Sequence, residues 1–258
     1  MAMLDGSMRL VLRVLEAMNR EAEGGPVGTL AAGAVPPGGL RPTGGRRHEP
    51  YGKGILSALH RAEEGFRLGL ELLRLLKAEK GSLFDFLEQL VPMVAAMQTE
   101  DVLVCPAAHT STGDSALLLV LRREDDRSFS LTVCATGAVS LRKHPCRRNA
   151  ASGQLEYSTC VCVRGLPRER LADSTFWFLL FRQPFGGTTA GAASETSLLY
   201  DVLLPGLNDT PLPTSAAMPG GAAWTPQPLS ADFSRGECAL VALGAALRCL
   251  LYTSPSPR

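Results

Sequence analysis

The sequence predicts an α+β protein with an N-terminal helical hairpin, a central antiparallel sheet of about four strands, and C-terminal helices. Apolar residues recur at helical spacing up to residue 100, at strand spacing over residues 101–164, and at helical spacing again beyond them. Hydrophobic residues make up 45% of the 258-residue chain, enough for a core of ordinary size. Because the two periodicities are segregated along the chain, we expect separate helical and sheet layers.

The N-terminal part is predicted to hold an amphipathic helix over residues 1–22 and a Gly/Pro-rich linker over residues 23–54. Charged residues interrupt every apolar run of the first helix, which excludes a signal peptide. The clearest helical pattern of the chain follows the linker. Its buried face is expected at Leu59, Ala62, Phe66, Leu70 and Leu73.

A further helix is predicted after Gly81, which ends the preceding one. Ser82 and Asp85 have the spacing of an acidic capping box at its start. Pro92 is expected to kink or split this helix, because proline removes one amide donor from the helical ladder. Two adjacent amphipathic helices predict a helical hairpin.

Four short segments rich in valine, leucine and aromatic residues predict the strands of an antiparallel meander. They are "DVLVCP", "ALLLVLRRE", "SFSLTVCATG" and "QLEYSTCVCVRG". "REDDRS" predicts the turn between the second and third strands, and the unbroken "ALLLVL" indicates a central strand covered on both faces. In the last strand, alternation places Val161 and Val163 on one face and Cys160 and Cys162 on the other.

Helices are expected to return after the sheet. Pro167 suits a first helical turn, and "STFWFLLFRQ" predicts an apolar helix anchored by Trp177. "ETSLLYDVLLPGL" predicts a short helix with a stripe that includes Val202, ended by Pro205 and Gly206.

The domain organisation follows from these shifts in composition. The α+β domain is expected over residues 55–207 and a Pro-rich linker over residues 208–232. Residues 233–248 are expected to start a second, truncated domain. Residues 249–258, "CLLYTSPSPR", are expected to be a non-native tail, because they resemble the translated adaptor that ends many transcript-derived sequences.

Charge and cysteine content limit the classes of function. The net charge is +1 and no block of like charges occurs, so neither a nucleic-acid groove nor a polybasic membrane patch is expected. No apolar run reaches the length of a membrane span, and we expect a cytoplasmic protein whose seven cysteines are reduced.

Cys160 and Cys162 invite a zinc interpretation, but no second Cys or His pair follows at a suitable spacing, so no metal and no cofactor is predicted. Cys105, Cys134 and Cys146 are expected to be buried or half-buried thiols.

Several phrases together resemble the N-terminal part of very large protist proteins of the ubiquitinyl hydrolase type. They are "KGSLFDFLEQLVPMVAAMQTEDVLVCPA", "SFSLTVCATG" followed by "HP", "LPRERLADSTFWFLLFR", "LLYDVLLPGLNDTPL" and Gly236-Glu237-Cys238. The similarity spans residues 50–248. It implies a thiol-dependent isopeptidase that hydrolyses the bond after the C-terminal glycine of ubiquitin, with ubiquitin or ubiquitinated proteins as partners. The family carries Gly-Thr-Cys where this chain has Glu237, which puts the role of Cys238 in doubt.

Cys238 is the candidate nucleophile because it lies where a polar turn gives way to an apolar helical pattern. A thiol at a helix N-terminus faces the positive end of the macrodipole, which favours the reactive thiolate. The carboxylate of Glu237 acts in the opposite direction. The alternative interpretation is that Cys238 is the first buried residue of an apolar helix.

A cysteine nucleophile needs a base, and the chain holds four histidines. His48 falls in the Gly/Pro-rich linker and His60 on the long helix, so both are poor candidates. His109 follows the first strand in a polar loop. His144 is the preferred catalytic base because its His-Pro matches the resembled family, although a solvated loop histidine and a base beyond residue 258 are alternatives.

Two functions from different classes are therefore predicted. One is the front end of a thiol-dependent ubiquitinyl hydrolase, in which this fragment alone is inactive. The other is a non-catalytic protein-interaction or scaffold module of a giant intracellular protein. The environment of the candidate site residues distinguishes the two, because function belongs to the site and not to the fold.

Overall fold

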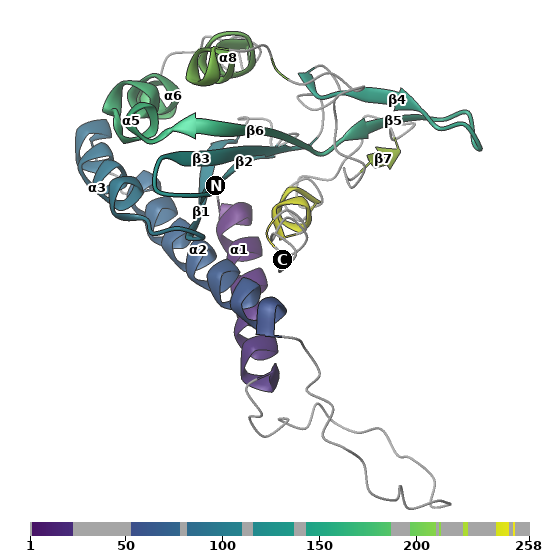
Figure 1. Ribbon diagram of the computed structural model, residues 1–258, viewed down its shortest axis with the longest axis horizontal. Coiled ribbons are helices and arrows are strands. Elements are labelled where there is room, and N and C mark those ends of the chain that lie inside the picture. The colour runs from purple at the N-terminus through teal and green to yellow at the C-terminus, as the bar shows by residue number, and fades with distance from the viewer. Residues whose placement is uncertain are drawn as a thin grey trace, which may run out of the picture.

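The fold is α+β, as the sequence predicts: a four-stranded antiparallel sheet lies between two sets of helices (Figure 1). It is seen in a computed structural model that describes residues 2–22, 53–77, 82–109, 116–136, 143–186, 197–209, 212, 224–226, 241–247 and 250. The sheet order is β1-β2-β3-β6, and each neighbouring pair is antiparallel.

The N-terminal helices are α1 (Ala2–Ala22) and α2 (Lys53–Lys77), which pack side by side (Figure 1). All five residues predicted for the buried face of α2 are buried. Polar contacts also join the pair: the side-chain amide of Asn19 on α1 donates to the Glu63 carboxylate on α2 at 2.6 Å, and Arg67 on α2 lies 3.8 Å from the Glu16 carboxylate on α1. Helix α2 packs mainly against α1, which precedes it in the chain beyond the linker. It has much less contact with the helix that follows it.

Helix α3 (Leu83–Ala96) starts at the predicted capping box, in which Ser82 and Asp85 exchange both hydrogen bonds. Helix α3 continues through Pro92, so the predicted split does not occur. Proline frees the carbonyl four residues earlier, which belongs to Glu88. Both Glu88 and Pro92 are exposed, so water can satisfy that carbonyl.

The main sheet consists of β1 (Val102–His109), β2 (Ala116–Arg123), β3 (Ser128–Ala135) and β6 (Cys160–Pro167). As predicted, β2 is central, and its residues 117–121 are all buried. The predicted turn joins β2 to β3. Asp125 closes it by accepting hydrogen bonds from the backbone amides of Arg127 and Ser128 at 2.7 and 2.8 Å.

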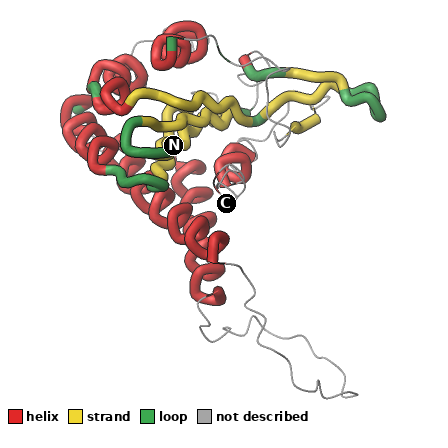
Figure 2. The backbone as a smooth tube through the Cα atoms, in the orientation of Figure 1, coloured by secondary structure: helices red, strands yellow, loops and turns green. Residues whose placement is uncertain are grey.

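A second, small sheet continues from the end of the first one (Figure 2). Its strands are β4 (Cys146–Arg148), β5 (Leu155–Ser158) and β7 (Trp224–Pro226), in the order β4-β5-β7. The fourth predicted strand is thus two strands, β5 and β6, which belong to different sheets. At the junction, Ser158 Oγ donates to the carbonyl of Cys160 and accepts from its amide, a local bonding pattern that competes with a continuous ladder.

The later helices are α5 (Arg168–Ala172), α6 (Ser174–Gly186), the π-helix η1 (Leu198–Leu203) and α8 (Leu204–Asn208). Trp177 is buried on α6, and its indole N–H donates to the carbonyl of Leu171 at 2.8 Å. Pro205 does not end the helix as expected, because it lies in the first turn of α8, where its missing amide costs no hydrogen bond. Val202 is 57% exposed while Tyr200 is buried, since the wider π-helical turn changes which residues face the core.

Two hydrophobic clusters hold the layers together. The first joins one sheet face to α3, α5, α6, η1 and α8. The second joins the other face to α1 and α2, and it also includes Ala242, Leu243 and Ala246 from helical residues 241–247. This last helical segment therefore shares a core with the sheet and the N-terminal helices.

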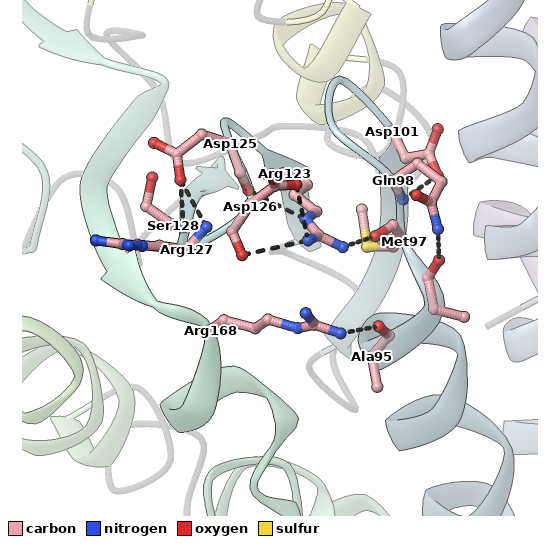
Figure 3. Close-up of polar contacts among 11 residues, drawn as sticks. Ala95, Met97, Gln98, Asp101, Arg123, Asp125, Asp126, Arg127, Ser128 and Arg168 are labelled. Atoms are coloured by element: carbon pink, nitrogen blue, oxygen red, sulfur yellow. Dashed lines mark hydrogen bonds and ion pairs between the residues drawn. The ribbon is translucent and has the colours of Figure 1, made fainter.

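Arg123 links α3 to the turn between β2 and β3 (Figure 3). The residue is 5% exposed, and its guanidinium donates to the carbonyls of Met97, Asp125 and Asp126. Nearby, Arg168 donates to the carbonyl of Ala95 at 3.0 Å. Two cationic side chains thus satisfy carbonyls at the C-terminal end of α3, where the helix dipole also favours positive charge.

Gly69 allows α2 to approach β1 closely, and Gly69→Ala is expected to lower the free energy of unfolding by about 2 kcal/mol. A Cβ at this position would overlap the carbonyl oxygen of Val104 and lie 3.0 Å from Met8 Cε, so the helix and strand would have to separate. Urea denaturation checks this value. Gly65→Ala should cost less, because its Cβ would lie 2.9 Å from Val102 O.

Gly6→Ala on α1 is the matched control, because open space surrounds that position. It should raise the stability by up to about 1 kcal/mol through better helix propensity. Equal effects of the Gly69 and Gly6 substitutions would contradict the close-approach argument.

Candidate functional site

The predicted site residues fall in different parts of the chain. Cys238 and His48 lie outside the described residues. His60 is exposed on α2, and His109 is the last residue of β1. His144 is buried, and both of its ring nitrogens have hydrogen-bond partners.

Three elements position His144. The residue comes two positions before β4, and its ring reaches Ser158 at the end of β5 and Tyr200 on η1. Nδ1 lies 2.7 Å from the carbonyl oxygen of Ser158, and Nε2 lies 2.5 Å from the hydroxyl oxygen of Tyr200. His144 therefore connects the small sheet to the C-terminal helical layer.

The hydrogen bonds determine the tautomer of His144. A carbonyl oxygen only accepts, so Nδ1 carries the proton and donates to Ser158. Nε2 is then the acceptor, and the Tyr200 hydroxyl donates to it. Both ring nitrogens are engaged in the neutral ring.

Burial keeps this pair uncharged. His144 is 5% exposed, and desolvation lowers its pKa to about 4, although the hydrogen bond to Ser158 acts in the opposite direction. Burial also raises the pKa of Tyr200 well above its ordinary value. At neutral pH the site is a hydrogen-bonded imidazole and phenol without net charge.

An ion pair lies directly beside the His144–Tyr200 contact. Lys143 Nζ contacts both carboxylate oxygens of Asp201, at 2.8 and 2.6 Å. Two consecutive residues, Lys143 and His144, thus contact two consecutive residues of η1. The ion pair is partly exposed and contributes little free energy by itself, so the buried pair carries most of this connection.

The ring of His144 makes both of its hydrogen bonds inside the protein. A general base needs a ring nitrogen within reach of the proton that it removes, and here Nε2 is occupied by Tyr200 inside the protein. The sulfur of Cys146, two residues along the chain, lies 3.5 Å from the backbone oxygen of His144; this contact does not involve the ring. The sequence analysis missed Tyr200, which appeared only as one residue of the apolar "SLLYDVLL" stripe.

The cysteines are arranged as predicted. Cys105 and Cys134 are buried and Cys146 is half-buried. Cys160 and Cys162 face Cys134 and Thr132 across the β3–β6 pair, while Val161 and Val163 face Val133 and Leu131. Within the described ranges, no group of three or more His, Cys, Asp or Glu side chains could hold a metal ion. No helix of the described part is long and apolar enough to cross a membrane.

Two helices carry an exposed aromatic pair. Phe84 on α3 is 68% exposed and Phe178 on α6 is 37% exposed, and their ring centroids lie 6.2 Å apart. The buried Phe86 and Phe181 contact each other below them, with centroids 4.7 Å apart. The rings of Phe84 and Phe178 therefore remain accessible to solvent beside a buried aromatic contact between the same two helices.

Comparison with known proteins adds no relative: no family model, curated protein or solved structure matches the chain. Functional inference therefore depends on the geometry of the chain and on the sequence resemblance.

Proposed function

We propose that the α+β region is a non-catalytic protein-interaction module of a larger intracellular protein. The observation that carries this proposal is the exposed pair of Phe84 and Phe178, which comes from two helices that pack together. Exposed aromatic clusters are unfavourable in water, and aromatic residues are enriched at the centres of protein interfaces.

The chemistry around the pair supports a protein partner. Asp85 and Glu88 are exposed on α3, and Arg182 is exposed on α6, so charged side chains of both signs accompany the aromatic rings. An apolar centre with a polar rim is the usual organisation of a protein interface. The resemblance to ubiquitinyl hydrolases supports ubiquitin, or a ubiquitinated protein, as that partner.

The engaged state of His144 also supports an interaction function over a catalytic one. Its Nδ1 and Nε2 both have protein partners and its pKa is low, so the ring serves to hold η1 against the small sheet. A second candidate function remains the thiol-dependent hydrolase, favoured by the resemblance that includes Gly236-Glu237-Cys238. In that case the base is a group other than His144.

One experiment tests both proposals, with a ubiquitin probe that carries a C-terminal electrophile. We expect the 258-residue chain to bind the probe without a covalent adduct. The double substitution Phe84→Ala and Phe178→Ala should weaken binding at least about tenfold, because two aromatic anchors are lost. Calorimetric titration measures the affinity, and intact mass spectrometry detects any adduct.

The control is Leu10→Ala, which removes an exposed apolar side chain from α1 on a different element. It should leave the affinity unchanged. Equal affinity of the double variant and the unsubstituted chain would overturn the proposed surface. An adduct that disappears with Cys238→Ala would support the hydrolase instead.

A further inference from the structure

Two cysteines face each other in the core of the main sheet. Cys134 on β3 is opposite Cys160 on β6, and their sulfur atoms lie 3.6 Å apart. Neither cysteine is in a disulfide, and both are buried, with Cys134 fully covered and Cys160 9% exposed. They are 26 residues apart in the chain, so sheet pairing and not local sequence brings them together.

The register places this pair where cross-strand side chains are closest. The amide of Ala135 donates to the carbonyl of Thr159, which identifies the neighbouring position as the hydrogen-bonded one. Hydrogen-bonded and non-hydrogen-bonded pairs alternate, so Cys134 and Cys160 occupy a non-hydrogen-bonded pair. Its Cα separation of about 4.5 Å falls within the range that a disulfide spans, and side-chain rotation alone brings the sulfurs to bonding distance.

The other described cysteines lack this arrangement across the main sheet. Cys105 is opposite Leu119 and Cys162 is opposite Thr132. The register therefore selects one pair of strand cysteines for reaction with each other.

We propose that Cys134 and Cys160 form a dithiol site that a small hydroperoxide converts to an intramolecular disulfide. The Cys160 thiolate attacks one oxygen of hydrogen peroxide, giving a sulfenic acid and releasing hydroxide. The Cys134 thiolate then attacks Sγ of Cys160 and displaces hydroxide, which forms the disulfide. In total, two thiols lose two electrons and two protons, and one peroxide is reduced to two molecules of water.

The order of the two steps follows from exposure. Cys160 is the more accessible thiol and lies at the start of β6, next to the junction with the small sheet, whereas Cys134 is enclosed within β3. A hydroperoxide is small, so a transient local opening of the fold that excludes a bulky disulfide reagent would admit it. Cys134 already lies beside the sulfur that it must attack.

The bond would close a loop that contains two strands of the small sheet, β4 and β5. Residues 135–159 carry His144, β4 and β5, and the carbonyl that accepts the His144 hydrogen bond belongs to Ser158, two residues before Cys160. Oxidation would therefore fasten this loop to β3 at its base. A covalent tie of this kind stabilises chiefly by restricting the unfolded chain.

The test is peptide mapping of the 258-residue chain after treatment with hydrogen peroxide and alkylation of the remaining thiols. We expect a cross-linked peptide pair that contains Cys134 and Cys160, with an intact mass lower by two hydrogen atoms and a higher melting temperature. Dithiothreitol should reverse all three changes. In Cys134→Ala and in Cys160→Ala the cross-link should be lost, and circular dichroism checks that each variant is folded.

Cys105→Ala is the matched control, because it removes a buried β-strand thiol without touching the pair. It should form the cross-link as the unsubstituted chain does. Independent oxidation of Cys134 and Cys160 to sulfinic acids, or no reaction at either thiol while the chain remains folded, would overturn the proposal. Cross-links to a different cysteine would overturn it as well.

Discussion

Arg123→Ala is expected to lower the free energy of unfolding by about 3 kcal/mol. The substitution removes the donors that satisfy the carbonyls of Met97, Asp125 and Asp126. Met97 is buried, so its carbonyl would keep its desolvation cost without a partner, whereas water can reach the carbonyls of the exposed Asp125 and Asp126. Bonds to a charged donor are among the stronger ones. Urea denaturation of the variant and the unsubstituted chain measures the difference.

Two other arginines of the same region serve as controls. Arg127→Ala removes an exposed side chain from the same turn and should change the stability by less than about 0.5 kcal/mol. Arg168→Ala removes one bond, to the carbonyl of Ala95, and should have an intermediate effect of about 1 kcal/mol. If Arg123→Ala behaves like Arg127→Ala, Arg123 does not hold α3 to the turn.

Local patterns predicted most of the elements. The capping box of α3 depends on two residues three apart, and the buried face of α2 depends on a spacing within one helix. Each of the four main strands has eight residues, in which apolar residues either alternate with polar ones or follow one another without interruption. In each case the residues that determine the element lie within a few helical turns or one strand. The spacing of residues along the sequence is therefore enough to predict the element.

Non-local contacts were not predictable in the same way. Strands β4 and β7 are three residues long, too short for a period, and they exist because β5 pairs with both. Gly65 and Gly69 gave no signal as interior glycines of a helical pattern, because their role is the contact with β1. Arg123 was one charge in "RREDDRS", and only the packing of α3 shows why it is buried.

The candidate site shows the same division. His144 was selected because it precedes a proline in a sequence that resembles a known family, which is a local feature. Its partners, Ser158 and Tyr200, lie 14 and 56 residues away, and they decide that the ring is neutral and enclosed. The identity of a histidine was thus predictable, but its chemistry depends on the elements that surround it.

The chemistry of His144 leads to an expected loss of stability in acid. The folded state holds a neutral ring with a pKa of about 4, whereas a histidine in the unfolded chain has a pKa of about 6.5. As the pH falls below about 6.5, the unfolded state therefore binds a proton that the folded state excludes. Stability is fully present above this value and declines toward pH 4, by about 3 kcal/mol from this group.

The measurement is the free energy of unfolding between pH 7 and pH 4 for the unsubstituted chain and for His144→Gln. Glutamine cannot take up a proton in this range, so the variant should lose about 3 kcal/mol less over the interval, even if it is less stable at pH 7. The control is Leu10→Ala, because this exposed side chain of α1 carries no titratable group and its removal should leave the pH profile unchanged. Parallel profiles for the unsubstituted chain and His144→Gln would mean that His144 is protonated as readily in the folded protein as in the unfolded one. In that case the imidazole of His144 would titrate in the folded protein, and His144 would again be a candidate for the catalytic base.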